Sequence, residues 1–235
     1  NLTLDDNGVT VEFWMKKSGW GLPANSREAI FDMATPNLTP VDSDYRRMVI
    51  HMYNSSSPAG GMHAAIVEGT TRNMFSFPGS LSVASLADGE WHHYAFVFED
   101  SYKVAKLYID GKFAEESTSP SATAISPTNT SLNACIGSQY SSQDLKTLLT
   151  DLNKAEPGYN KLSASLDEFR FWKTTRTAEQ IGMHYNTQVF GGTNTDDANT
   201  DLGVYYKFNE GIMNTEQDAT ILDYSGRISN GVWTG

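Results

Sequence analysis

The chain has 235 residues but a single cysteine, Cys135, so no disulfide can form within it. This scarcity excludes the small secreted domains that several disulfides hold together in place of a large core. Cys135 stands in an apolar stretch between Ala134 and Ile136, which favours a small buried side chain over a reactive thiol. We therefore assign no chemistry to it.

Positive charge is also scarce. The chain carries 17 Lys and Arg residues against 28 Asp and Glu residues, which gives a formal net charge of −11. A protein that binds nucleic acid needs a basic face to neutralise the phosphates, so we expect no nucleic-acid partner. The excess of carboxylates indicates a solvated acidic surface, or oxygen ligands available to hard cations.

Long apolar runs are missing as well. No stretch of about 18 apolar residues could span a membrane, and no charged-then-apolar segment opens the chain, so we expect no membrane insertion. The first residue is Asn1 rather than Met, and we expect the chain to be part of a longer protein. Hydrophobic residues nevertheless make up 39% of the chain, enough for a sizeable core in one main domain.

Apolar and polar residues alternate with a period of two in several segments that turn residues separate, a pattern typical of an antiparallel sandwich. Strands are predicted at 9–15, 91–98, 106–109, 166–172 and 204–208. The third of these is followed by Asp110-Gly111, a strong hairpin signal. The side chains predicted to form the core, from their places on apolar strand faces, are Phe13, Phe96, Leu107, Ile109, Phe169 and Phe171.

Two short amphipathic helices are predicted as covers on a sheet. Leucines recur at helical spacing within 145–152, after two serines suited to capping. Thr177 and Gln180 have the spacing of a capping box before a second apolar run. Residues 191–201 lack apolar periodicity and are predicted to form a flexible link.

Four phrases in a fixed order carry a family resemblance. The segments 9–16 (VTVEFWMK), 88–97 (DGEWHHYAFV), 107–112 (LYIDGK) and 166–172 (LDEFRFW, after Ile136-Gly137) are similar to the phrases T-V-E-x-W-V-K, D-G-x-W-H-H-V-A, L-Y-I-D-G and I-D-E-V-R-I-W. These are the phrases of the laminin-G-like jelly rolls, which are concanavalin A-like and related to pentraxins. The resemblance implies an all-β, two-sheet antiparallel jelly-roll sandwich with one or two short peripheral helices. This domain is expected over 1–190, with a helical insertion at about 139–164.

The tail 202–235 holds a phrase that in this family normally precedes a domain. Its residues 204–208 alternate as a half-buried strand does. We predict that this strand completes the sandwich by pairing antiparallel with 166–172, whose edge would otherwise be exposed. The alternative is that the tail begins a following unit. The tail also resembles laminin-G-like inserts in structural proteins of marine bacteriophages.

The fold alone specifies no ligand, because one fold hosts many functions. We expect a recognition or adhesion module of a larger extracellular or virion-surface protein, which binds a glycan or a protein surface through loops at one rim. Aromatic side chains in loops suit contacts with sugar rings. The candidates are Trp20, Tyr53, Tyr140 and Tyr159. The alternative function is purely architectural, as a virion decoration or connector domain that contacts neighbouring subunits.

Catalysis is not expected. The jelly-roll glucanases use paired carboxylates in a Glu-x-Asp-x-x-Glu strand motif. The partial match at 216–221 has Ile221 in place of the second glutamate and falls in the tail. The neighbouring His92 and His93 point to opposite faces of a strand and cannot converge on one metal ion. A glycoside hydrolase is therefore the least favoured alternative.

Asp167 is the most informative carboxylate. Strict alternation places it on the apolar face with Phe169 and Phe171, where an ionised carboxylate must be paired, hydrogen-bonded or metal-bound. The family resemblance implies one structural Ca²⁺ held by an aspartate of this strand and a glutamate near the first strand. Asp167 and Glu12 are the positional matches. The alternative is that Asp167 accepts hydrogen bonds from loop N–H groups without a metal.

Overall fold

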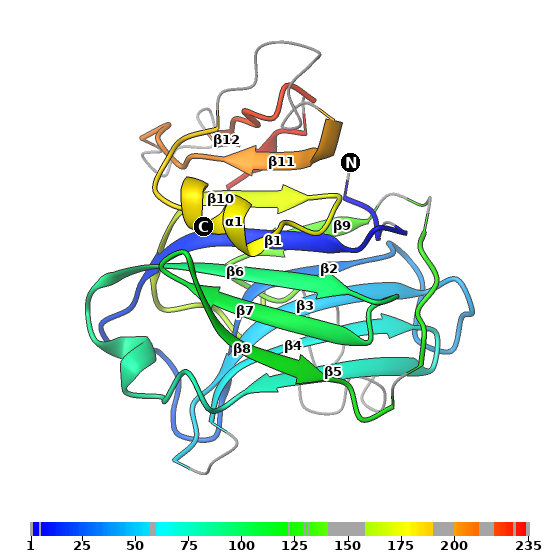
Figure 1. Cartoon of the computed structure of the whole chain (residues 1–235), viewed down its shortest axis with the longest axis horizontal. Coiled ribbons are helices and arrows are strands. Elements are labelled where there is room, and N and C mark those ends of the chain that lie inside the picture. The colour runs from blue at the N-terminus through cyan, green and yellow to red at the C-terminus, as the bar shows by residue number, and fades with distance from the viewer. Residues whose placement is uncertain are drawn as a thin grey trace.

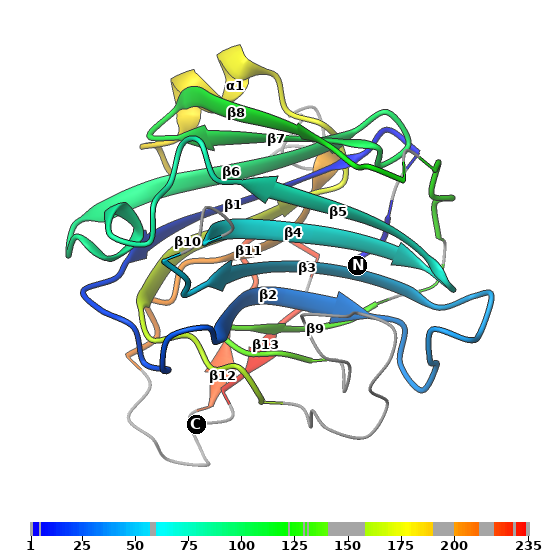
Figure 2. The same ribbon diagram turned by 90° about the horizontal axis from the view of Figure 1, so that it is seen from below.

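Two antiparallel β-sheets lie face to face and enclose the core (Figures 1 and 2). The computed structural model describes residues 2–4, 6–56, 60–121, 123–128, 130, 132–140, 158–189, 200–211, 219–227 and 229–233. Within these residues, no helix is long and apolar enough to cross a membrane.

The six-stranded sheet has the order β11-β10-β1-β6-β7-β8. Its strands are β1 (Val9–Lys16), β6 (Trp91–Glu99), β7 (Val104–Ile109), β8 (Lys112–Thr118), β10 (Ser165–Trp172) and β11 (Leu202–Tyr206). The five-stranded sheet has the order β5-β4-β3-β2-β9. Its strands are β2 (Arg27–Ala34), β3 (Arg46–Tyr53), β4 (Gly61–Glu68), β5 (Thr71–Phe77) and β9 (Asn133–Ile136). The predicted all-β sandwich is therefore confirmed.

Three smaller elements complete the described chain. They are the 3₁₀ turn η1 (Ser85–Ala87), the helix α1 (Ala178–His184) and a two-stranded sheet of β12 (Thr220–Ile221) and β13 (Gly231–Val232). The predicted capping box opens α1, since Gln180 N–H donates to the Thr177 side chain and Thr177 N–H donates to the Gln180 side chain. Ile181 packs on the outer face of the six-stranded sheet, so this helix covers a sheet as predicted. Residues 145–152 of the other predicted helix lie outside the described residues.

The core between the sheets contains five of the six predicted side chains at full burial. These are Phe13, Phe96, Leu107, Phe169 and Phe171. Ile109 is the correction: it packs against the core but is only partly buried, because it ends β7 beside the turn at Asp110. Phe31 of β2 contacts both Phe169 and Phe171 across the interface, with ring centroids 5.1 and 6.1 Å apart. Aromatic contacts thus join the two sheets.

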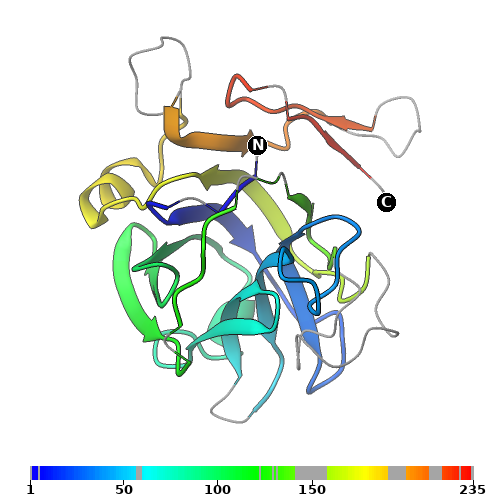
Figure 3. The same ribbon diagram turned by 90° about the vertical axis from the view of Figure 1, so that its right-hand side faces the viewer.

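β11 completes the six-stranded sheet, as Figure 3 shows, and pairs antiparallel with β10. Tyr206 lies opposite Phe169, and Val204 lies opposite Phe171. This confirms the pairing that the tail sequence predicts. Residues 191–199 of the predicted link lie outside the described residues.

Candidate functional site

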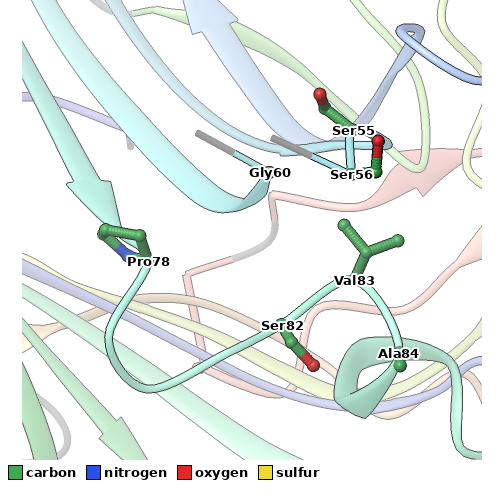
Figure 4. Close-up of a pocket in the computed structure, with 7 residues that line it drawn as sticks. All are labelled: Ser55, Ser56, Gly60, Pro78, Ser82, Val83 and Ala84. Atoms are coloured by element: carbon green, nitrogen blue, oxygen red, sulfur yellow. The ribbon is translucent and has the colours of Figure 1, made fainter. Parts of the chain in front are cut away.

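A hollow of about 260 Å³ opens at one rim of the sandwich (Figure 4). The β3–β4 and β5–β6 connections provide its lining residues, which are Ser55, Ser56, Gly60, Pro78, Ser82, Val83 and Ala84. The lining combines serine hydroxyls with small apolar groups, and none of these seven side chains titrates. Rim loops were expected to form the binding surface, but no motif in the sequence singles out these serines.

The close approach of the two connections depends on Gly60. A Cβ atom at this position would lie 2.0 Å from the backbone oxygen of Ser55 and 2.8 Å from a methyl group of Val83. Any larger residue would therefore push the two walls of the hollow apart.

Trp20 supports the β5–β6 wall from behind. Its indole Nε1–H donates to the backbone oxygen of Val83 at 3.4 Å, and its ring packs against the core. The Lys17 ammonium lies 4.5 Å from the centre of the same ring. Among the four predicted aromatic residues, Trp20 bonds through its side chain to a residue that lines the hollow, whereas Tyr53 meets Ser55 through its backbone oxygen.

Lys17 and Glu28 form a fully buried ion pair beneath the rim, with 2.7 Å between Nζ and Oε2. The Lys17 ammonium also donates to the backbone oxygen of Ser163, and the backbone N–H groups of Gly21 and Ser163 donate to the Glu28 carboxylate. The pair therefore ties the β1–β2 connection to the segment before β10. The burial of both charges costs desolvation energy, which their attraction and these hydrogen bonds offset.

Two further contacts fix the walls. Asn54 directly precedes the lining residue Ser55 in the sequence, and its side-chain amide donates to the backbone oxygen of Leu22 at 3.2 Å. On the other wall, the Glu115 carboxylate of β8 accepts hydrogen bonds from the backbone N–H groups of Gly79 and Ser80. The described parts of both walls are thus held in place, as is usual for the preformed sites of small ligands.

Tyr53 lies elsewhere, on the outer face of the five-stranded sheet. Its ring lies 4.1 Å from the Arg27 guanidinium carbon and contacts the His63 ring edge-on. The His63 ring in turn stacks on His51 with centroids 5.4 Å apart. His51 is buried, and burial together with the positive charges of His63, Arg27 and Arg47 holds its pKa well below the usual range.

Tyr140 and Tyr159 occupy a third region, beside β9. The Tyr140 N–H donates to the buried Asp32 carboxylate at 2.9 Å, and its ring packs against Tyr45 and Val67. Tyr159 is exposed and pairs through its backbone with Gln139. The four predicted aromatic residues therefore do not form one site.

Glu12 lies on the outer face of the six-stranded sheet, in a buried ionic cluster. Its carboxylate oxygens lie 3.1 Å from Arg176 Nε, 3.4 Å from His93 Nε2 and 3.8 Å from Arg170 Nη1. Burial alone would raise the pKa of Glu12, but the His93 contact and the two arginine charges outweigh it and lower the pKa. These neighbours do not fit a Ca²⁺ site, which is built from oxygen ligands.

Asp167 lies opposite Trp14 rather than on the face of Phe169 and Phe171. The predicted face is wrong because a β-bulge interrupts the alternation at Glu168, whose φ is +51°. Asp167 accepts a hydrogen bond from the N–H of Glu168, and burial raises the pKa of its carboxyl group. The described part of the chain holds no group of three His, Cys, Asp or Glu side chains suited to a metal, so Ca²⁺ at Asp167 stays a prediction. The partial glucanase motif at 216–218 lies outside the described residues.

Comparison with known proteins places this architecture in a family. The family model of the concanavalin A-like lectin/glucanases superfamily, in its laminin-G form, matches residues 1–182. No curated protein sequence matches the chain.

Solved structures share the fold at low sequence identity. A candidate carbohydrate-binding protein from Bacteroides ovatus matches with 16% identity and a TM-score of 0.58, over 100% of this chain and 53% of that protein. A variant of the NanB sialidase from Streptococcus pneumoniae matches with 17% identity and a TM-score of 0.51, over 81% of this chain and 26% of the enzyme. This chain thus spans about half of the first protein and a quarter of the second. Because the family match covers well over half of the chain, the chain belongs to the concanavalin A-like lectin/glucanases superfamily.

Proposed function

We propose that this chain is a non-catalytic carbohydrate-recognition module of a larger extracellular protein, and that the rim hollow binds the glycan. One observation carries the proposal: both connections that form the hollow are held by hydrogen bonds, the β5–β6 connection through Trp20 and Glu115 and the β3–β4 connection through Asn54. A preformed concave site loses little ordering entropy when a small ligand binds.

The lining suits a neutral sugar. The hydroxyl group of Ser56 can donate and accept hydrogen bonds, as sugar hydroxyls require. The hydroxyl group of Ser82 already contacts the N–H and the hydroxyl group of Ser85, both at 3.1 Å, and keeps one acceptor position. Val83 and Pro78 offer apolar contacts to the C–H groups of a sugar ring. Because none of the described lining residues is cationic, the hollow favours neutral sugars over carboxylated or sulfated ones.

The same lining argues against glycoside hydrolysis. Retaining and inverting glycosidases both need two carboxyl groups, about 5 to 9.5 Å apart, that flank the scissile bond. The lining residues of the hollow include none. The fold shared with a candidate carbohydrate-binding protein supports the same class of function.

A glycan array, run with and without Ca²⁺, tests the proposal. Ala84 is an exposed lining residue, so Ala84→Tyr should fill the hollow without disturbing the core. Glu90→Tyr adds the same ring at an exposed position of the same connection and serves as the control. We expect glycan binding that is lost in Ala84→Tyr and kept in Glu90→Tyr.

Two results would contradict the proposal: an array with no bound glycan, or binding that Ala84→Tyr leaves intact. The first result would favour an architectural role, in which loops contact neighbouring protein subunits. A virion setting stays a prediction that rests on the resemblance of the tail.

A further inference from the structure

The tail carries an exposed apolar surface outside the region that the family model matches. Leu222, Tyr224, Val232 and Trp233 are 38–72% exposed, and all four lie on or beside β12 and β13. The family match ends at residue 182. Clustered exposed apolar side chains mark interaction sites more often than scattered ones do.

This surface is hollowed rather than flat. A cavity of about 170 Å³ opens between the segment after β11 and the end of β13, lined by Phe208, Glu210, Gly211, Ile221 and Trp233. It has two aromatic rings and one carboxylate. A water molecule occupies roughly 30 Å³ in the liquid, so the cavity has the volume of only a few water molecules. It therefore has room for one sugar ring but not for a folded partner.

The aromatic wall is anchored to the core. The Tyr206 ring lies between Phe169 and Phe208, with centroid distances of 6.4 and 6.2 Å. Its hydroxyl donates to the backbone oxygen of Ser229, which holds the segment before β13 against β11. The backbone N–H of Trp233 donates to the backbone oxygen of Ala219 at 2.7 Å and fixes the opposite wall.

Phe208 adopts a φ of +52°, a conformation that is costly for a bulky residue. Strain of this kind, of the order of 1–3 kcal/mol, collects at ligand sites, where it directs a side chain into position. Here the strained residue is one of those that line the cavity, and its ring lies beside that of Tyr206.

Glu210 supplies the polar group. Its Oε1 accepts the N–H of Leu222 at 3.0 Å, which orients the carboxylate at the cavity. A carboxylate has about four lone-pair sites, so further acceptor capacity remains for the hydroxyl groups of a ligand. The negative charge disfavours an acidic sugar, as does the net charge of −11 of the chain.

We propose that this cavity is a second carbohydrate site, which holds one neutral sugar residue against Trp233 and Phe208 while its hydroxyl groups donate to Glu210. A protein partner could cover the exposed apolar side chains, but it would leave the cavity and its oriented carboxylate without a role. The tail site is separate from the rim hollow and does not depend on it.

Nuclear magnetic resonance of the indole N–H signals of the whole chain tests the site. The probes are the neutral methyl glycosides of glucose, galactose and mannose, with glucuronic acid as the acidic counterpart. We expect at least one neutral glycoside to shift the Trp233 signal saturably, and glucuronic acid to leave it in place. Trp91 is 42% exposed against 48% for Trp233, so its signal is the matched internal control.

Two variants separate this site from the rim hollow. Glu210→Gln keeps the side-chain shape and should weaken the effect on Trp233 by about ten-fold or more, because a charge-assisted hydrogen bond is lost. Ala84→Tyr blocks the rim and should leave the effect unchanged. The proposal fails if no neutral glycoside moves the Trp233 signal, if Trp91 moves equally, or if Glu210→Gln binds as the parent does. A Trp233 signal that moves on dilution of the protein alone would instead show that copies of this chain cover the patch.

Discussion

Trp14 lies directly opposite Asp167 in the β1–β10 pair, although unbroken alternation would place Asp167 on the core face. The bulge at Glu168 causes the change of face, and it also aims the Glu168 carboxylate along the outer surface of the sheet. There Glu168 accepts hydrogen bonds from Arg170 and from the hydroxyl group of Tyr205 on β11. One irregular residue thus links the closing strand to the tail strand.

Removal of the tail should destabilise the domain. Truncation after Gln188 takes away the buried side chains of Leu202, Val204 and Tyr205 and exposes the edge of β10. Since each large apolar side chain contributes about 1.5–3 kcal/mol when buried, the free energy of unfolding should fall by several kcal/mol. Urea denaturation and light scattering check this. A truncated protein that stays monomeric, with unchanged stability, would show that the tail is dispensable.

The sequence predicts strands of the six-stranded sheet, such as β1 and β10, because apolar residues recur at every second position in them. It does not predict β2, β3 and β4, which are buried on both faces and show no clear alternation. It does not predict the bulge at Glu168, because one residue in a left-handed conformation leaves no periodic trace. The ionic cluster around Glu12 is missed for another reason: its partners His93, Arg170 and Arg176 are far from Glu12 in the sequence, and only the fold brings them together. The rim serines carry no pattern, since loop positions follow the geometry of their neighbours rather than a repeat.

The buried pair beneath the rim should be strongly coupled. Lys17→Met leaves the Glu28 carboxylate buried without its cation, at a cost of about 3–5 kcal/mol. Glu28→Gln combined with Lys17→Met removes both charges, so the double variant should be more stable than Lys17→Met alone. Urea denaturation of the two single variants and the double variant gives the coupling energy. Strictly additive losses would mean that the pair contributes no coupling.

Glu12 should stabilise the fold through its ion pairs, without a bound metal. Glu12→Gln removes the buried negative charge beside Arg176 and Arg170, and the expected loss of stability is about 3 kcal/mol or more. This loss should be the same in Ca²⁺ and in a chelator, because the partners of the carboxylate are cationic side chains. A loss seen only in Ca²⁺ would restore Glu12 as a ligand.

Asp167→Ala tests the predicted calcium site. If Ca²⁺ raises the melting temperature of the parent but not that of Asp167→Ala, the predicted site is supported.

Stability should fall as the solution becomes acidic, and His51 is one source of this dependence. The pKa of His51 lies well below its usual value of 6.5 in the folded chain, first through burial and then through the charges of His63, Arg27 and Arg47. Below pH 6.5 the unfolded chain therefore binds a proton that the folded chain does not. The free energy of unfolding then decreases with falling pH, by up to about 1.4 kcal/mol for each pH unit.

His92 has the opposite effect on the pH dependence of stability. Its hydrogen bond to Asp110 raises its pKa, with Asp88 as a second partner, so its contribution is present below pH 6.5 and is lost as the pH rises through the raised value. Because His92 is partly exposed, this contribution should be the smaller of the two. Urea denaturation between pH 5 and 7 should thus show a shallower loss of stability in His51→Gln than in the parent, and a steeper one in His92→Gln. Equal slopes in all three proteins would mean that neither histidine governs the acid sensitivity of the fold.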